Sequence, residues 1–379
     1  MHVRQYHFHD GHWFPSLPGS DKSQLILAFG GSQYALDQKL RQALQVAFPF
    51  AEIIGCTTSG EILSTEVYDE SLVVTAIHFE DTAIETVSVN VANFQRSFDA
   101  GIALAETLPK NNLKYVLVIS DGQQVNGTEL VDGLNQNLPA GTLITGGMAG
   151  DGERFEKTYV WHNDSCHAGD ILVCGFYGDA IRIGHGTLGG WSAFGPNRLV
   201  TKSSGNILYE LDNQPALELY KKYLGEFSEQ LPSSALRFPL SLQLSGEDEA
   251  VVRTILNINE ADQSMIFAGD MPQGATAKLM KANFDTLIEG ANTAAIGALK
   301  SLREPGASLA LLISCVGRRL VLNQRVYEEL EAVEDVVTAD CPMCGFYSYG
   351  EISPLQNGTQ CRLHNQTMTI TTLSEVLDA

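Results

Sequence analysis

The strongest constraint on the fold is an order of segments that occurs three times along the chain. Apolar runs typical of buried strands lie at residues 25–29, 115–120 and 309–315. After each run, apolar residues recur at helical spacing: Leu36, Leu40, Leu44 and Ala47 in the first unit, Leu130, Leu134 and Leu138 in the second, and Val326, Leu330 and Val333 in the third. Strands that alternate with such helices predict an α/β fold of mixed α+β character, with mixed sheets flanked by helices.

Each unit ends in a glycine-rich turn. Residues 55–62, GCTTSGEI, and 345–352, GFYSYGEI, share the pattern G-x-x-[ST]-x-G-E-I, and residues 146–152 read GGMAGDG. The shared pattern in a shared context indicates an internal pseudo-duplication, with two related strand-helix-strand halves that face a common cleft. The alternative is two unrelated turns that both need glycine for a positive φ angle.

The length of 379 residues suggests about two domains of ordinary size. The polar, proline-containing stretch 225–238 is the best boundary candidate, and a helix predicted from Pro215 leads into the second domain. We therefore predict an N-terminal arm over residues 1–24, a first domain over 25–214 and a second domain over 215–373.

Four of the nine histidines lie within the first twelve residues, namely His2, His7, His9 and His12. A metal-binding arm is one interpretation. The other is a polar, partly frayed terminal strand, because alternating positions such as His7 and His9 share one face of a strand and chain ends are usually mobile.

The formal net charge is −21. Such a surplus of carboxylates repels both a phosphate backbone and an anionic membrane surface, so we expect no nucleic-acid partner. Membrane insertion is not expected either, because no apolar run approaches the ~20 residues that cross a bilayer. The N-terminus lacks the apolar run of a secretory signal, which predicts a cytoplasmic protein with reduced cysteines.

The turns and their neighbours resemble the FIST family of sensory domains, which combines a FIST N and a FIST C part. The resemblance covers about residues 25–373. It rests on IIGCTTSGEI (53–62), ITGGMAGDG (144–152), VTKSSGNILYELDNQPALELY (200–220), CVGRR (315–319), GFYSYGEISP (345–354) and HNQT (364–367). It implies a ligand-sensing protein of signal transduction.

Stand-alone FIST proteins of this length resemble the NosP group, which is described as haem-binding, nitric-oxide-responsive regulators of histidine kinases. The resemblance therefore implies a haem cofactor and a gas or other small-molecule ligand. Since no output segment follows the FIST-like part, it also implies a separate histidine kinase or diguanylate cyclase as partner. The sequence leaves undecided whether the chain forms a homodimer.

His185 is the candidate axial ligand for such a haem. Histidine is the usual donor to haem iron in gas sensors, because it leaves the opposite face of the iron open. His185 lies between Gly184 and Gly186, which would let a flat macrocycle approach the backbone, and Trp191 could line the macrocycle. The alternative is a loop histidine that bonds to a carbonyl group. The competing histidines are His78, His162 and His167.

The cysteines form a second candidate site. Cys341-x-x-Cys344 is followed by Cys361-x-x-His364, and three thiolates with one imidazole can complete a tetrahedral zinc shell. The three cysteines, joined by Cys315, could instead hold an iron-sulfur cluster, because soft thiolates suit iron and zinc alike. Without a metal they would be small buried hydrophobic residues.

Polar groups on the glycine-rich turns are the candidate contacts for a small ligand. These residues are Thr57, Ser59, Glu61, Gly147, Asp151, Tyr347, Tyr349 and Glu351. If the duplication holds, Glu61 and Glu351 point at the same interface. A small zwitterion such as an amino acid could be held there by a carboxylate, backbone N–H groups and either Arg318 or Arg319. A glutamate after glycine can equally cap a turn.

Enzyme signatures are weaker. Cys56 follows a strand and loosely resembles a nucleophile on a strand-to-loop turn, but no His or Asp partner can be assigned to it. The turn at residues 146–150 lacks the Lys-Ser/Thr pair of a phosphate loop. We therefore predict that the chain is not an enzyme, with a Cys-dependent oxidoreductase or hydrolase as the alternative.

Overall fold

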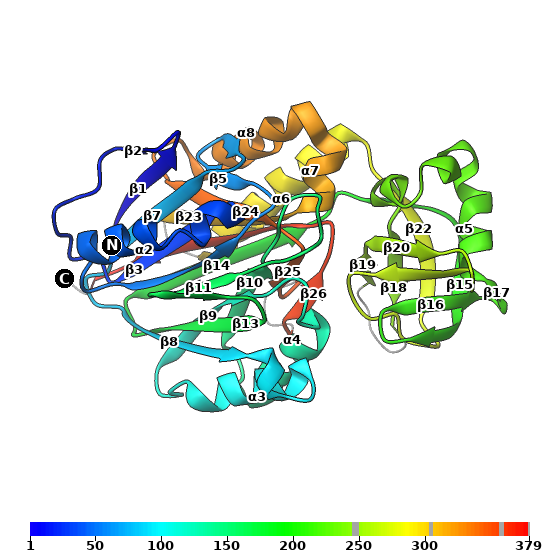
Figure 1. Cartoon of the computed structure of the whole chain (residues 1–379), viewed down its shortest axis with the longest axis horizontal. Coiled ribbons are helices and arrows are strands. Elements are labelled where there is room, and N and C mark those ends of the chain that lie inside the picture. Colours follow the sequence, from blue (N-terminus) through cyan, green and yellow to red (C-terminus); the bar gives the residue numbers. More distant parts are fainter. Residues whose placement is uncertain (245–249, 303–305, 356–359, 378–379) are drawn as a thin grey trace.

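Three mixed sheets form the main body of the molecule, and a smaller unit is inserted into it (Figure 1). The structure is a computed structural model that describes residues 1–244, 250–302, 306–355 and 360–377. The predicted mixed α/β fold is confirmed. No described helix is long and apolar enough to cross a membrane.

The three sheets repeat one arrangement of strands. The first runs β12(Ser165–His167), β11(Val160–His162), β4(Glu52–Thr57), β3(Leu25–Gly30), β7(Leu72–His78), β1(His2–His9) and β2(His12–Phe14). The second runs β26(Arg362–His364), β25(Gly350–Ser353), β10(Leu143–Met148), β9(Leu113–Ser120), β13(Asp170–Tyr177) and β8(Ala83–Asn90). The third runs β6(Glu66–Tyr68), β5(Glu61–Leu63), β24(Met343–Ser348), β23(Leu309–Cys315), β27(Met368–Glu375) and β14(Ile181–Leu188).

Each sheet is built around one parallel pair, namely β3 with β4, β9 with β10, and β23 with β24. A glycine occupies the same register in all three pairs: Gly55 opposite Ala28, Gly146 opposite Val118, and Gly345 opposite Leu312. At each position a Cβ atom would collide with the carbonyl oxygen of the opposite residue. The duplication inferred from two turns is therefore part of a threefold repetition, and the first glycine of each turn is there because the backbones approach closely.

The strand after each turn leaves its own unit and pairs antiparallel with the next. β5 pairs with β24, β25 pairs with β10, and β11 pairs with β4, so the exchange closes on itself. This cyclic exchange is a long-range pairing that joins segments up to hundreds of residues apart in sequence.

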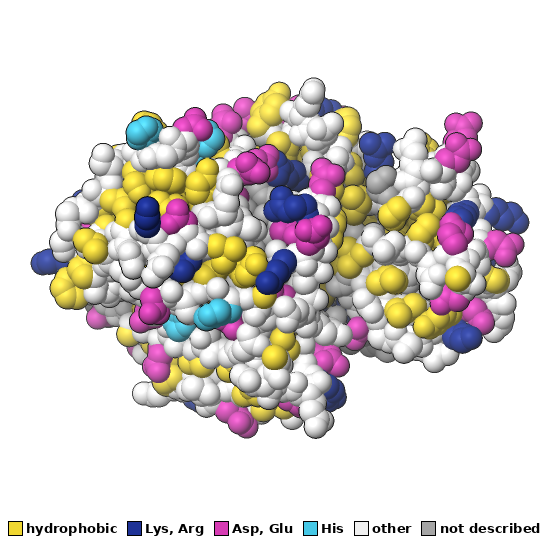
Figure 2. Space-filling model, in the orientation of Figure 1, with side chains coloured by type: hydrophobic (Ala, Val, Ile, Leu, Met, Phe, Trp, Pro, Cys, Tyr) yellow, Lys and Arg dark blue, Asp and Glu magenta, His cyan; other side chains and the backbone are white. Residues whose placement is uncertain are grey.

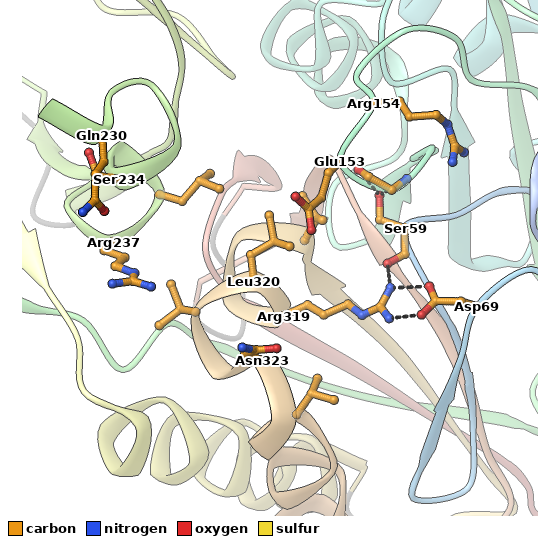
Figure 3. Close-up of a pocket in the computed structure, with 15 residues that line it drawn as sticks. Ser59, Asp69, Glu153, Arg154, Gln230, Ser234, Arg237, Arg319, Leu320 and Asn323 are labelled. Carbon is orange, nitrogen blue, oxygen red and sulfur yellow. Dashed lines mark hydrogen bonds and ion pairs between the residues drawn. The ribbon is translucent and has the colours of Figure 1, made fainter. Parts of the chain in front are cut away.

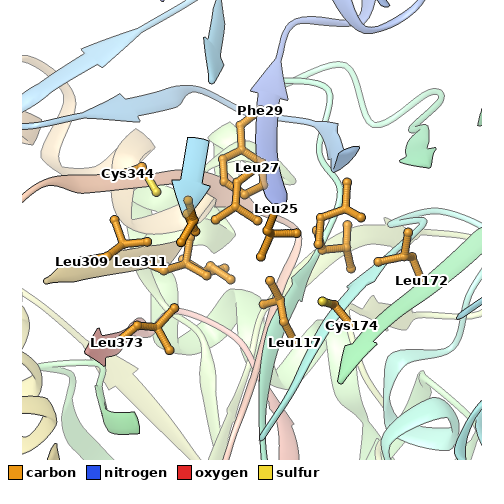
Figure 4. Packing of buried hydrophobic residues seen from close by; sticks show 14 of the residues in the cluster. Leu25, Leu27, Phe29, Leu117, Leu172, Cys174, Leu309, Leu311, Cys344 and Leu373 are labelled. Atoms are coloured by element: carbon orange, nitrogen blue, oxygen red, sulfur yellow. The ribbon is translucent and has the colours of Figure 1, made fainter. Parts of the chain in front are cut away.

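The central core lies where the three parallel pairs face one another (Figure 4). Equivalent residues of β3, β9 and β23 meet there: Leu25, Leu27 and Phe29; Tyr115, Leu117 and Ile119; Leu309, Leu311 and Ile313. All are buried, which explains why these strands read as continuous apolar runs rather than as alternating ones.

Helices cover the outer face of each sheet. α2(Gln38–Ala47), preceded by the short α1(Ser32–Ala35), packs on the first sheet, and α3(Ser97–Thr107) and α4(Gly127–Asn137) pack on the second. α6(Phe284–Leu302) and α8(Val326–Val337) pack on the third, while α7(Val316–Leu322) follows β23 at the edge of the body. The apolar spacing seen in the sequence is the face that each helix turns to its sheet.

The smaller unit is a separate sheet with its own hydrophobic core. Its strands run β19(Ala250–Arg253), β18(Leu240–Gln243), β22(Thr276–Lys281), β15(Ser192–Ser204), β16(Ile207–Leu211), β21(Ser264–Phe267) and β20(Ile255–Asn259), and β17(Gln214–Pro215) pairs with β16. α5(Ala216–Leu224) covers it, and the 3-10 turns η2(Gly225–Gln230) and η3(Ser233–Arg237) follow; the remaining 3-10 turns are η1(Val91–Asn93) and η4(Asn323–Arg325). The division predicted at residues 214/215 falls within this unit, at β17.

Hydrogen bonds between described residues hold the smaller unit to the body. Arg253 Nη1 donates to the carbonyl oxygen of Leu363 at 3.0 Å, and Gln366 Nε2 donates to that of Leu236 at 3.2 Å. Asn126 Nδ2 donates to Asp270 Oδ1 at 3.1 Å. These contacts leave a hollow between the two units, where acidic and basic side chains adjoin (Figure 2).

Candidate functional site

Glu61 and Glu351 are buried anchors of their turns. Glu61 accepts hydrogen bonds from Thr58 Oγ1 and from the Ser71 amide and hydroxyl groups, the last two at 3.2 and 2.9 Å. Burial raises the pKa of Glu61 to about 7, against the lowering effect of these hydrogen bonds. This partner set makes Glu61 primarily a clamp on the turn.

Glu351 repeats the same arrangement in the third unit. Ser348 Oγ donates to one carboxylate oxygen at 2.7 Å, and the Thr367 amide and hydroxyl donate to the other at 3.1 and 3.0 Å. Burial raises the pKa of Glu351 to about 7 as well. Ser348 therefore corresponds to Thr58, and Thr367 corresponds to Ser71.

Most of the other predicted ligand residues are also engaged inside the body. Tyr347 donates to Glu329 Oε1 at 2.6 Å, and Thr57 Oγ1 accepts from the Tyr159 amide at 3.0 Å. Gly147 faces Ile313, opposite Glu351 in the strand ladder. Because these groups and Glu351 are buried and occupied, the structure does not bring them to a cleft.

Asp151 fixes the second turn. Its carboxylate accepts from the amides of Phe155, Glu156 and Lys157 at 2.9 to 3.0 Å, and from the Tyr349 hydroxyl. The Phe155 ring stacks on Tyr349 with centroids 4.6 Å apart. These contacts orient the loop that follows, which carries Glu153 and Arg154.

The cleft itself lies between the body and the smaller unit and has a volume of about 640 Å³ (Figure 3). One wall is formed by Ser59 and Gly152 from the turns and by Glu153 and Arg154 from the loop after the second turn. The facing wall is formed by residues of η2 and η3, and α7 supplies the floor. A smaller extension of about 350 Å³ shares Ser59, Asp69, Gly152 and Arg154 with the cleft. Of the predicted ligand residues, Ser59 lines the cleft, whereas Glu61 and Asp151 line only the extension.

Arg319 is already paired. Its guanidinium binds both carboxylate oxygens of Asp69, at 2.8 and 2.5 Å, and donates to the carbonyl oxygen of Ser59 at 2.5 Å. Arg318, the other predicted cation, is buried and donates to Glu329 Oε2 at 2.8 Å. Arg318 therefore lies in the body, whereas Arg319 ties α7 to the first turn at the rim of the cleft.

Two charged side chains in the cleft have no hydrogen bond or ion pair within the described part of the chain. They are Arg237, at the end of η3, and Glu153, on the opposite wall; both are exposed (Figure 3). Sequence reasoning missed both. Arg237 lies in the stretch expected to be a domain boundary, and nothing in the sequence indicates that this stretch folds back against the second turn.

The cysteines and His364 are distributed over different parts of the core. Cys344 packs in the central core, Cys341 under α6 and α8, and Cys361 against α4. Burial raises the pKa of Cys341 to about 11 and that of Cys344 to about 12, which disfavours the thiolate that binds metals. His364 bonds through Nε2 to the Ser353 carbonyl oxygen at 2.9 Å. Within the described residues no three His, Cys, Asp or Glu side chains are grouped to hold a metal ion. The structure does not assemble the predicted four-residue site.

His185 lies on β14 and lines a separate cavity of about 800 Å³ with apolar residues such as Ile144 and Leu302. Burial lowers the pKa of its imidazole, which favours the neutral form that can donate a lone pair. The residues around His185, however, do not have the roles that the sequence predicted for them. A Cβ at Gly184 or Gly186 would collide with the backbone of α6, so both glycines serve helix packing. Trp191 donates to the Gln366 carbonyl oxygen at 2.8 Å and does not line this cavity. The donor fits a haem, whereas the glycines and the tryptophan that were expected to surround the macrocycle do not line this cavity.

Cys56, the candidate nucleophile, packs in the central core. Burial raises the pKa of its thiol well above the ordinary value. A neutral, buried thiol is a poor nucleophile in this position.

Buried turns beside an open, charged cleft between two units are typical of a ligand-binding protein. The chain belongs to the FIST family: the FIST N domain matches residues 24–214 and the FIST C domain matches residues 216–354. FIST domains are sensor domains of signal transduction. An uncharacterized protein of Methanocaldococcus jannaschii is 22% identical over 360 residues, which cover 83% of this chain and 67% of that protein.

Among solved structures, cyanuric acid hydrolase from A. caulinodans matches over 99% of both chains, with a TM-score of 0.38 and 6% identity. The prediction that this chain is not an enzyme is contradicted by this match to a hydrolase, and we withdraw it. At this level of similarity the match carries no statement about a reaction of this chain.

Proposed function

We propose that the chain senses a small zwitterionic metabolite of the amino-acid class, bound in the cleft between the body and the smaller unit. The main support for this proposal is the pair of unpartnered charged side chains, Arg237 and Glu153, on opposite walls of the cleft. A guanidinium binds a carboxylate with two parallel hydrogen bonds, and a carboxylate binds an ammonium group. A zwitterion would satisfy both walls at once.

The remaining lining suits such a ligand. Ser59 and Asn323 offer short polar contacts, while Leu236 and Leu320 offer an apolar surface for a side chain. The volume of about 640 Å³ lies within the range of roughly 300–1,000 Å³ that is usual for small-molecule sites. Because the two walls belong to different units, a bound ligand would change how the smaller unit sits on the body, and a separate histidine kinase or diguanylate cyclase could read that change.

A thermal-shift screen against an amino-acid panel, followed by calorimetric titration of the hits, tests this proposal. We expect Arg237→Ala and Glu153→Gln each to weaken binding at least tenfold, since each removes a charged contact worth about 1.5–3 kcal/mol. Arg96→Ala is the matched control, because Arg96 pairs with Asp99 on the surface at 3.1 Å, away from the cleft. No hit in the panel, or a hit whose affinity is unchanged in Arg237→Ala, contradicts the proposal.

Haem-dependent sensing of nitric oxide is the second candidate. It is favoured by one observation, the buried His185 imidazole on the wall of the cavity of about 800 Å³. A bound haem would supply the iron that takes the gas. Haem titration should then produce a Soret band that shifts in His185→Ala but not in the control His78→Ala, and a chain that gives no Soret band after haem addition excludes this candidate.

A further inference from the structure

Three histidines share one face of the N-terminal hairpin. β1 and β2 pair antiparallel, with His9 directly opposite His12 and His7 opposite Phe14. Alternate residues of a strand point to the same side, and directly opposed residues share a side as well. His7, His9 and His12 therefore point to one side of the hairpin. β1 is also paired with β7 over residues 2–8, so the arm is an ordered part of the first sheet.

Two of these imidazoles have buried nitrogen atoms without a partner. The rings of His7 and His9 are stacked, with centroids 5.6 Å apart and an interplanar angle of 13°. His7 Nε2 and His9 Nδ1 are both buried and make no hydrogen bond within the described structure, and the His7 residue is only 9% exposed. A buried polar atom without a partner is costly, and such atoms call for an occupant that satisfies them.

A neighbouring carboxylate prepares one of these nitrogens to act as a donor. Asp10 Oδ2 lies 3.4 Å from His9 Nε2. A carboxylate on one nitrogen of an imidazole orients the other nitrogen toward a metal, as is common for metal-bound histidines. In His9 that other nitrogen is the unpartnered Nδ1.

We propose that His7 and His9, completed by His12, bind a divalent transition-metal ion such as Zn²⁺ on this face of the hairpin. Two histidines separated by one residue on a strand can reach one ion at the usual Zn–N distance of about 2.0–2.1 Å. In the described structure the three side chains do not converge on one point, and the His7 and His9 rings are nearly parallel, so binding requires a change of side-chain rotamer at these histidines. His12 is exposed, so its side chain has room to turn toward His9. Imidazole donors suit zinc, copper and nickel.

The same sheet supplies a matched control pair. His2 and His78 are stacked across β1 and β7, with centroids 6.3 Å apart and an interplanar angle of 14°. Their nitrogens are engaged, however: His78 Nδ1 lies 3.1 Å from the Lys22 carbonyl oxygen and His2 Nε2 lies 3.3 Å from Glu80 Oε1. Stacking is thus retained in this pair without the unpartnered atoms, and His2 is far more exposed than His7.

Calorimetric titration of the full chain with ZnCl₂ at pH 7.5 tests the proposal. We expect one equivalent to bind, with affinity reduced at least tenfold in His9→Ala and His12→Ala, and unchanged in His2→Ala and His78→Ala. X-ray absorption should show nitrogen donors at about 2.0–2.1 Å. Since His7→Ala alters a buried site, its unfolding midpoint without metal is compared with that of the wild-type chain, while His9→Ala and His12→Ala probe the more exposed donors. Absence of zinc binding, or an equal loss in His2→Ala, overturns the proposal.

Discussion

The amide nitrogen of Ser59 donates a hydrogen bond to the carbonyl oxygen of Tyr347 at 2.8 Å. The equivalent bonds from Tyr349 to Met148, at 3.1 Å, and from Gly150 to Thr57, at 2.9 Å, complete a ring that passes through all three units. Each turn therefore donates to one neighbouring unit and accepts from the other. The ring fixes the end of the body that borders the cleft, so the geometry of one cleft wall depends on all three turns.

The close approach at the start of each turn predicts a stability effect. In Gly55→Ala or Gly345→Ala the new Cβ would collide with the backbone of the neighbouring parallel strand, at Ala28 or Leu312 respectively. We expect the unfolding free energy to fall by about 3 kcal/mol or more, at the upper end of overpacking effects, because backbone cannot move aside as a side chain does. Urea unfolding measures the loss. Gly19→Ala is the control, since nothing lies within 4 Å of its added Cβ, and equal midpoints for the three variants would refute the close-packing argument.

The local elements could be predicted from sequence because their signals are local. Continuous apolar runs such as 309–315 belong to strands buried on both faces, and the turn glycines Gly55 and Gly345 stand where backbones meet. The partners of β5, β11 and β25 could not be predicted, because each pairs outside its own unit and pairing leaves no mark on a single strand. For the same reason Arg237 and Glu153, which line one cleft only because the smaller unit folds back against the body, carried no sequence signal.

The buried carboxyl group of Glu61 should make the unfolding free energy of the chain depend on pH. Its pKa in the folded chain is about 7 against an ordinary value of 4.5, a difference on the order of 3 kcal/mol. Since the folded state binds this proton more tightly than the unfolded state, the contribution is fully present below pH 4.5 and is lost as pH rises through 7. We expect the unfolding midpoint of the wild-type chain to fall between about pH 5 and pH 8.

Glu61→Gln should flatten part of that dependence, because the amide cannot ionise, and Glu351→Gln should flatten a similar part, since burial raises the pKa of Glu351 to about 7 too. Thermal unfolding across this pH range is the measurement. Glu331 is exposed, so Glu331→Gln serves as the control and should leave the pH dependence of the unfolding midpoint as it is in the wild-type chain. If the unfolding midpoint of the double variant Glu61→Gln/Glu351→Gln depends on pH as steeply as that of the wild-type chain, groups other than these two carboxyls cause the dependence.

The hydroxyl group of Tyr347 is expected to stabilise the chain through its hydrogen bond to the buried ion pair of Arg318 and Glu329. Its hydroxyl donates to Glu329 Oε1 at 2.6 Å, and Glu329 Oε2 receives Arg318 at 2.8 Å. In Tyr347→Phe one carboxylate oxygen loses its closest donor in the core, so we expect a loss of about 1.5–3 kcal/mol in unfolding free energy. Tyr327→Phe, at a residue that is 46% exposed, should change little. Chemical denaturation of both variants measures the change in unfolding free energy. If Tyr347→Phe is as stable as the wild-type chain, another group donates to Glu329 in its place.

The contact between β14 and α6 offers a test with opposite outcomes on its two sides. A Cβ at Gly186 would collide with the Ala294 carbonyl oxygen, whereas a Cβ at Gly297, on α6, would lie 3.6 Å from Gly186 Cα, an ordinary contact distance. We therefore expect Gly186→Ala to destabilise the chain by about 1–3 kcal/mol or more. Gly297→Ala should be neutral or stabilising by up to about 1 kcal/mol, because alanine favours a helix interior. Thermal unfolding of the two variants gives the sign directly. If Gly186→Ala keeps the wild-type stability, the glycines beside His185 are free of the helix and the space in front of them is open to a ligand after all.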